Sequence, residues 1–166
     1  MSSFNAKYYC GAINPFNSVM YCIYLYKYSK KMSNMGYISL ADRIYYLNKM
    51  LNAVDLYHGI NLPNIWFCEH PVGSVMGRAK YGNRFCFYQN CTVGGNRTVD
   101  GKLFYPSIGE DVCMYSYSRI IGKCVVGNNV ILGTGTSVVN QDVPANVIVF
   151  GASPNLIFKE NNRGIV

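Results

Sequence analysis

Residues 108–139 read IGEDVCMYSYSRIIGKCVVGNNVILGTGTSVV, and an apolar residue recurs there at every sixth position. Glycine follows three of these residues, at Gly109, Gly127 and Gly133. The repeated apolar residues are Ile108, Met114, Ile120, Val126, Leu132 and Val138. The residues four positions later, of which the first five are small or β-branched, are Val112, Ser118, Cys124, Val130, Thr136 and Asp142. Upstream, the same step links Tyr81, Phe87 and Val93, with Met76 out of phase by one residue.

A six-residue period predicts a stack of short strands. Side chains alternate along a strand, so the repeated position and the one four residues later both point inward. A turn after every six residues lets three strands close a triangular coil of about eighteen residues. Stacked coils pair their backbone amides and bury a continuous core. The alternative is an ordinary β-rich domain with a chance period, and six successive matches argue against it.

The composition is that of a folded domain with a basic surface. Of 166 residues, 50% are hydrophobic and only 14% are charged, which excludes a disordered chain. The net charge of +7 favours anionic partners, such as a phosphate-rich cofactor. The longest basic run is only Lys30-Lys31, so we expect no nucleic-acid partner.

The cysteines indicate a reducing compartment. There are seven of them, an odd number, without CxxC or zinc-type spacing, so we expect free thiols and a cytoplasmic protein. The first residues do not form a signal peptide, and the longest early apolar run, at 19–26, is too short to span a bilayer. The cysteines are Cys10, Cys22, Cys68, Cys86, Cys91, Cys113 and Cys124.

Residues 1–62 form a region with helical periodicity. One helix is predicted to begin at Asn14-Pro15, and a second at Ser39 with Asp42 completing a capping box. Gly59 and Pro63 then break the pattern, which makes His58 a solvent-facing loop residue. The apolar positions of the second helix are Leu40, Ile44, Leu47 and Leu51. The predicted boundaries are an α-helical region at 1–62, a β-helix at 63–157 with a loop excursion at 95–107, and a tail at 158–166.

The repeat resembles that of the hexapeptide-repeat acyltransferases. Those proteins form a left-handed parallel β-helix, an exception to the usual right-handed crossover. The resemblance, and not the period itself, implies the handedness. The implied fold is mainly β: a left-handed parallel β-helix of hexapeptide repeats preceded by a small α-helical N-terminal region.

Over roughly residues 60–160 the resemblance narrows to the serine acetyltransferases. The matching segments keep the order of that family: EHPVGSVMG (69–77), YQNCTVGGN (88–96), YPSIGEDV (105–112), and ILGTGTSVV (131–139) with VPANVIVFGASPNLI (143–157). In that family a DHATG-like motif carries the catalytic histidine. His70 matches this histidine, with Glu69 in the place of the aspartate.

The resemblance implies acetyl-CoA-dependent O-acetyl transfer. A histidine, whose ordinary pKa is near 6.5, can take the proton of an acceptor hydroxyl and return it to the CoA thiolate. The resemblance assigns this role to His70, and Glu69 would hold the acceptor or tune the imidazole. The family's orienting aspartate matches Asp55 by spacing and Asn61 by local pattern, and the sequence does not choose between them.

One departure concerns the acceptor. The family places an Arg-His pair before a proline at the end of the excursion, where it contacts serine. Here Phe104-Tyr105 precede Pro106, which makes Tyr105 the candidate acceptor contact and weakens L-serine as the acceptor. A sugar, as in surface-polysaccharide O-acetylation, is the second candidate acceptor.

The resemblance also implies that acetyl-CoA lies along the outside of the C-terminal coils, between subunits of a homotrimer or of a hexamer joined through the N-terminal helices. Lys159 is the candidate partner of a CoA phosphate, and the small residues equally suit turns of the repeat. The candidate CoA residues are Tyr115, Ser116, Gly133, Thr134, Gly135, Gly151, Ala152, Ser153 and Lys159.

The pattern leaves two other functions as alternatives. A catalytically silent β-helix could serve as a scaffold, and it would not need His70. A metal-dependent β-helix enzyme of the gamma-type carbonic anhydrase kind uses three histidine ligands, whereas this chain has two histidines in all, so we expect no metal.

Overall fold

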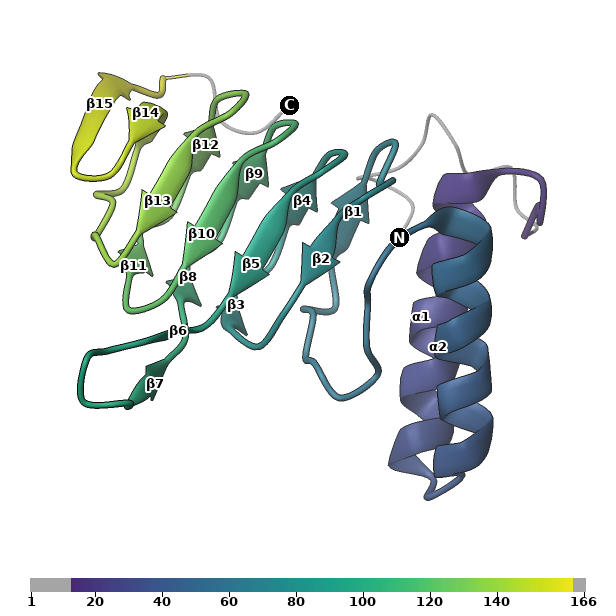
Figure 1. Cartoon of the computed structure of the whole chain (residues 1–166). Helices are drawn as coiled ribbons and strands as arrows, with labels where there is room; N and C mark the ends of the chain where they lie inside the picture. Colours follow the sequence, from purple (N-terminus) through teal and green to yellow (C-terminus); the bar gives the residue numbers. More distant parts are fainter. Residues whose placement is uncertain (1–12, 163–166) are drawn as a thin grey trace.

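The computed structural model describes residues 13–162, which form a β-helix with a helical pair at one end (Figure 1). Helices α1 (Ser18–Asn34) and α2 (Ile38–Asn52) pack against each other before the first coil. Fifteen strands follow. They are β1 (Trp66–Cys68), β2 (Val75–Met76), β3 (Lys80–Tyr81), β4 (Phe85–Phe87), β5 (Thr92–Gly94), β6 (Asn96–Arg97), β7 (Leu103–Phe104), β8 (Ser107–Ile108), β9 (Val112–Met114), β10 (Arg119–Ile121), β11 (Val125–Val126), β12 (Val130–Leu132), β13 (Ser137–Val139), β14 (Val147–Ala152) and β15 (Asn155–Glu160).

The strands form three faces, because the chain passes from one face to the next along each coil. The first face contains β1, β4, β9 and β12, and the second face contains β2, β5, β10 and β13. The third face contains β3, β8 and β11. Neighbouring strands within each face are parallel, so every coil pairs with the coil before it and the coil after it.

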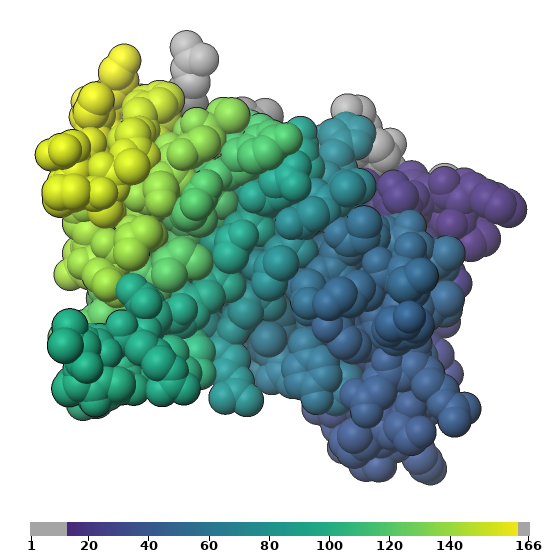
Figure 2. Space-filling model, in the orientation of Figure 1, coloured from purple at the N-terminus to yellow at the C-terminus, as the bar shows by residue number. Residues whose placement is uncertain are grey.

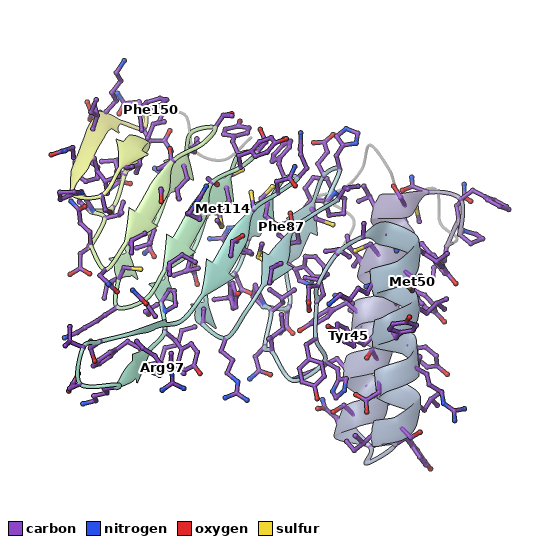
Figure 3. All side chains as sticks on the ribbon, in the orientation of Figure 1. Tyr45, Met50, Phe87, Arg97, Met114 and Phe150 are labelled. Atoms are coloured by element: carbon purple, nitrogen blue, oxygen red, sulfur yellow. The ribbon has the colours of Figure 1, made fainter. Side chains whose placement is uncertain are left out.

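The strand register confirms the six-residue repeat. Met114 pairs with Leu132, Ile120 with Val138, and Ile108 with Val126, so each column joins repeat positions of successive coils. All six of these side chains are at most 3% exposed. Phe87 and Met114 lie inside the stack in Figure 3. The out-of-phase Met76 pairs in register with Val93, so a shorter connection in the first coil absorbs the missing residue.

The interruption of the repeat is a hairpin. Strands β6 and β7 pair antiparallel between β5 and β8, and Figure 2 shows this segment projecting from the coil at the lower left. The third face remains continuous across the interruption, because Tyr81 still pairs with Ile108. The β-helix therefore tolerates a loop without losing its register.

The two ends of the coil stack are covered differently. At the N-terminal end, the ring of Tyr26 on α1 meets Trp66 edge-on at 5.5 Å, and Trp66 stacks on Phe87 at 5.9 Å. At the C-terminal end, β15 pairs antiparallel with β14, and residues 158–160 belong to this strand. The hydrophobic core thus continues from the coils into α1.

Both predicted helix starts are wrong in detail. The side chain of Asn17, not Asn14, caps α1 by accepting a hydrogen bond from the Met20 amide. Helix α2 follows Tyr37 without a side-chain cap, and Asp42 instead bonds to His58. The Asp42 carboxylate, which the local sequence predicted to complete a capping box, therefore bonds to a residue distant in the sequence.

The buried face of α2 also differs from the predicted apolar positions. Leu40, Leu47 and Leu51 are 42%, 42% and 59% exposed. The buried residues are instead Ala41, Ile44, Asn48 and Asn52. Small or polar side chains suit this close helix contact because they reach backbone groups: the Asn48 amide donates to the Cys22 carbonyl, and the Ser29 hydroxyl donates to the Ala41 carbonyl.

The described cysteines are free and buried. Burial and, to a smaller extent, the Asp142 carboxylate raise the pKa of Cys124 to about 11, so this thiol stays protonated at neutral pH. Cys10 lies outside the described residues. Within residues 13–162, neither helix has the length and hydropathy needed to cross a membrane.

We predict that the columns of the repeat carry the stability. Replacing Ile120 with Ala should lower the free energy of unfolding by about 2–5 kcal/mol, because a fully buried side chain leaves a cavity between coils. Urea unfolding measures this change. Val125→Ala, on the outer side of the third face and 57% exposed, should change it by less than about 0.5 kcal/mol. Equal losses in both variants would contradict the inward assignment.

Candidate active site

The predicted site residues gather along one edge of the β-helix. We call this edge the first corner: it is where each coil turns from the first face to the second. His70 lies there between β1 and β2, and Ser116 and Thr134 occupy the corresponding turns of later coils. In the last coil β14 itself makes the turn, because Val149 pairs with Leu132 and Ala152 pairs with Ser137. The chain thus brings His70 and the candidate CoA residues onto one line.

His70 is exposed, and its backbone occupies the left-handed region with φ +48°. Its carbonyl accepts a hydrogen bond from the Val72 amide at 2.8 Å, and the buried Pro71 follows it. The strand register aligns Gly73, not His70, with the positive-φ residues Asn90 and Tyr117 of later turns, so the positive φ of His70 belongs to the longer turn between β1 and β2. Within residues 13–162 the imidazole has no hydrogen-bond partner, which leaves both ring nitrogens accessible to substrates.

Glu69 begins a ladder of polar side chains along the first corner. Its amide donates to the Phe87 carbonyl, which places it beside Tyr88. Burial, the neighbouring Cys86 thiol and a hydrogen bond to Glu69 all raise the pKa of Tyr88. The Tyr88 ring in turn lies 5.1 Å from the ring of Tyr115. Glu69 is thus an electrostatic neighbour of Tyr88, at the start of the first corner and next to His70.

Gly133 has a packing role that its sequence context did not show. A Cβ atom built on Gly133 would lie 2.7 Å from the ring of Phe150, so only glycine leaves room for that ring. The Lys159 ammonium lies 5.6 Å from the centroid of the same ring. Phe150 is 38% exposed and, with Tyr115 at 40%, gives the C-terminal part of the first corner an aromatic surface with a cation beside it.

The other small residues predicted to contact CoA lie either in open turns or at the end of the sheet. Gly135 has φ +75° and open space where a Cβ would stand, so a ligand can approach its backbone. Gly151 and Ala152 are exposed within β14. Ser153 is instead engaged by the protein, because its hydroxyl accepts a hydrogen bond from the Val139 amide at 3.0 Å.

The two candidate orienting residues lie differently. The backbone of Asp55 forms an isolated parallel β-bridge with Val75, beside the second face. Its carboxylate, however, accepts hydrogen bonds from the Tyr45 hydroxyl at 2.8 Å and from the Lys49 ammonium at 2.7 Å. Figure 3 shows Tyr45 on the helical pair. Asn61 is exposed in the connection to β1. Within the described residues neither side chain bonds to His70, so the orienting role stays a prediction.

Tyr105 is on a different edge from His70. The hairpin leaves the coil between β5 on the second face and β8 on the third face, an edge that we call the second corner. Tyr105 follows β7 there and is 40% exposed. Since His70 occupies the first corner, one chain does not bring these two candidate acceptor contacts to the same turn.

Sequence reasoning missed two residues of the first corner, Tyr88 and Phe150. Tyr88 directly follows the inward Phe87, and this position is the one that leads into the corner. The sequence signal for Phe150 is Gly133, because a glycine can leave room for a neighbouring side chain. In the linear sequence, Tyr88 and Phe150 look like ordinary hydrophobic residues. Among residues 13–162, no group of three or more histidine, cysteine or acidic side chains is arranged to hold a metal ion.

His58 is not a solvent-facing loop residue: it is 3% exposed and lies against α2. Its Nε2 is 2.9 Å from an Asp42 carboxylate oxygen, and the ring of Tyr57 lies 4.2 Å from the imidazole. The segment broken by Gly59 and Pro63 folds back onto the helix rather than extending into water. His58 therefore connects the helical pair to the first coil, away from the first corner.

No family model matches the chain. It is 30% identical over 119 residues to the serine acetyltransferase of Synechococcus elongatus, a match that covers 71% of this chain and 48% of the relative. The chain thus spans about half the length of this curated relative.

The solved structures agree. The serine acetyltransferase of Neisseria gonorrhoeae in complex with serine superposes with a TM-score of 0.74 at 22% identity, over 94% of this chain and 64% of that one. The enzyme of Brucella abortus in complex with coenzyme A gives 0.73 at 21% identity, over 87% and 56%. These neighbours confirm the predicted left-handed parallel β-helix, preceded by helices. In sequence and in fold, the chain is similar to serine acetyltransferases.

We predict that the contact between His58 and Asp42 stabilises the junction of helices and coils. Asp42→Ala should lower the free energy of unfolding by about 1–3 kcal/mol, because it leaves the buried His58 donor without its acceptor. Urea unfolding followed by circular dichroism measures the change. Asp42→Asn, which keeps an acceptor oxygen, should lose less. A loss as large in Asp42→Asn as in Asp42→Ala would show that the negative charge, and not the hydrogen bond, matters.

Proposed function

We propose that this chain, a hexapeptide-repeat protein of the serine acetyltransferase type, transfers the acetyl group of acetyl-CoA to the hydroxyl group of a small acceptor. The observation that carries the proposal is the first corner, which aligns His70 and Glu69 with Tyr115, Gly133 and the β14 turn. The relatives named above support acetyl transfer to serine as the reaction of the family. The structures in complex with coenzyme A and with serine support a thioester donor and a small hydroxyl acceptor.

In the proposed reaction His70 is the general base. Its imidazole takes the acceptor hydroxyl proton as the hydroxyl oxygen forms a bond to the thioester carbonyl carbon. The tetrahedral intermediate then expels the thiolate of CoA, and the imidazolium returns the proton to that sulfur. The products are the O-acetylated acceptor and CoA, so no external oxidant, reductant or nucleophilic side chain is required.

Glu69 has a positioning role in this proposal. Its backbone bond to Phe87 and its electrostatic contact with Tyr88 place it at the turn that carries His70. From there it can accept a hydrogen bond from a polar group of the acceptor or face the imidazolium as it forms. Removing water and fixing the two substrates together supply much of the rate enhancement in such reactions.

The C-terminal part of the first corner suits the acetyl-CoA. The exposed rings of Tyr115 and Phe150 offer apolar surface, the open turn at Gly135 allows close approach, and Lys159 adds a positive charge for a phosphate. We assign Ser116, Thr134, Gly151 and Ala152 to the same acetyl-CoA region. Ser153 holds the sheet end through Val139 and acts there as a support.

The active protein is proposed to be a homotrimer or hexamer. Because His70 and Tyr105 occupy different corners of one chain, an acceptor that touches both needs the hairpin of a neighbouring copy. The exposed apolar side chains of α2 give the helical pair a surface for further association. They include Leu40, Leu47, Met50 and Leu51. We place the protein in the cytoplasm, which the buried free thiols of the described chain support.

We predict that His70→Gln lowers kcat about 10²- to 10⁴-fold, because the base is lost and the fold is not. Mass spectrometry should follow the acetylated product from acetyl-CoA, with L-serine and a panel of sugars as acceptors. Unfolding stability should stay within about 0.5 kcal/mol of the wild type, since the imidazole is exposed. His58→Gln is the matched control: it should lose stability and keep kcat. An unchanged rate in His70→Gln would overturn His70 as the general base, and the absence of any product in the wild type would favour a non-catalytic β-helix.

We predict that the apolar face of α2 joins subunits. Light scattering coupled to gel filtration should give the mass of a hexamer for the wild type and of a trimer for Leu47→Glu, because a buried interface does not accept an unpaired carboxylate. Val125→Glu, which also replaces an exposed apolar residue but lies on the outer side of β11, away from the helical pair, should leave the mass unchanged. A monomeric wild type would contradict the assembly.

A further inference from the structure

The hairpin covers a groove on the outer side of the third face, and we call this groove the hairpin groove. It has a volume of about 490 Å³. Arg78 and Lys80, around the start of β3, line one side, and residues 103–107 line the other. The backbone fixes the two sides relative to each other, because the Lys80 amide donates to the Pro106 carbonyl at 3.0 Å. The groove is therefore a built part of the β-helix and does not depend on a loose loop tip.

The surroundings of the hairpin groove are positively charged. Arg78 and Lys80 are exposed, and within residues 13–162 neither forms an ion pair. Lys102 and Lys123 add two more ammonium groups, 5.2 and 5.3 Å from the ring centroid of Phe104. The lining contains no acidic residue.

The nearest acidic side chains are occupied elsewhere. Asp100 accepts a hydrogen bond from Thr98 within the hairpin turn, and Asp142 accepts one from the Val125 amide at 2.7 Å. Glu110 and Asp111 pair with Arg84. Arg84 offsets the charges of Glu110 and Asp111, and the charged residues of the lining are all cations, so a net negative ligand gains most from the groove.

The groove also offers a flat apolar surface. Tyr105 is 40% exposed, and its ring packs over Gly95, where a Cβ would lie 2.8 Å from the ring. The absence of a side chain at Gly95 therefore leaves room for the ring to lie against the backbone. A rigid aromatic ring beside cations binds compounds that combine a ring with an anion, because the ring covers the C–H face and the cations meet the charge.

We propose that the acceptor hydroxyl compound is an anionic sugar, one that carries a carboxylate or a phosphate, and that it binds in the hairpin groove. This inference rests on the proposed function, in which Tyr105 contacts the acceptor. Arg78 and Lys80 bind the anionic group, Tyr105 packs against the sugar ring, and the free hydroxyl is left for His70 of a neighbouring copy. A neutral sugar gains only the contact with the Tyr105 ring. Zwitterionic serine has neither a ring to pack against Tyr105 nor a net negative charge to attract the four cations, Arg78, Lys80, Lys102 and Lys123.

The test measures binding without acetyl-CoA, so that it does not depend on turnover. Calorimetry compares glucuronate, glucose 6-phosphate and glucose, which share a ring and differ in charge. The anionic sugars should bind at least about tenfold more tightly than glucose, and added salt should weaken them. Comparing the first two shows whether a carboxylate or a phosphate is preferred.

Variants identify the groove. Arg78→Gln combined with Lys80→Gln should remove the advantage of the anionic sugars, whereas Arg43→Gln combined with Lys31→Gln, the same charge loss on the exposed helices, should retain it. Tyr105→Leu should weaken all three sugars alike. Equal binding of glucose and the anions, or an unchanged advantage in the Arg78 and Lys80 variant, would overturn the inference.

Activity separates this inference from the proposed function. Acetylated L-serine, formed at a rate that the Arg78 and Lys80 variant does not change, would overturn the anionic acceptor and leave acetyl transfer intact. Groove-dependent binding of anionic sugars without His70-dependent acetylation would overturn the proposed function, and with it the acceptor role of the groove.

Discussion

The in-register pairing of each coil with the next is the constraint on which the rest of the structure depends. Strands of the inner coils pair their backbones with the coils on both sides, so the inward columns must repeat with the same spacing. A side chain that points inward in one coil therefore stands on an equivalent side chain in the next, as Met114 stands on Leu132. The same rule fixes what lies at the corners. His70, Ser116 and Thr134 share an edge because the faces on either side of them are locked in register.

This rigidity explains how the protein carries irregular features. The hairpin leaves and re-enters the coil without disturbing the pairing of Tyr81 with Ile108, because both sides of the interruption are already held by neighbouring strands. The end coils lack a neighbour on one side, and other elements replace it. Helix α1 covers the first coil through Tyr26 and Trp66, and β15 pairs with the last coil. The exposed edges of the sheet are thereby shortened at both ends.

The two corners differ in character, and this difference shapes the proposed chemistry. The first corner combines His70, the adjacent carboxylate of Glu69, and the aromatic surface of Tyr115 and Phe150. The second corner carries the hairpin. The basic side chains of the hairpin groove lie around it, and Arg78 and Lys80 among them form no ion pair within residues 13–162. Most acidic groups of the described chain are engaged with local partners, such as Asp55 with Lys49 and Asp111 with Arg84. Four of the basic residues behind the net charge of +7 surround the hairpin groove, namely Arg78, Lys80, Lys102 and Lys123.

The sequence by itself determined the β-helix, because a six-residue period is a local signal that survives without knowledge of contacts. It also located the interruption and singled out His70 and Glu69 through their flanking motif. It failed where the outcome depended on contacts between distant segments. Asp42 caps no helix because His58 folds back onto it, and Leu47 and Leu51 stay exposed because Ala41 and Asn48 make the closer helix contact. Gly133 is required by Phe150, a residue seventeen positions away that only the stacking of coils brings near. Tertiary structure alone decided these points, since burial and hydrogen bonding belong to pairs of residues that the linear order does not place side by side.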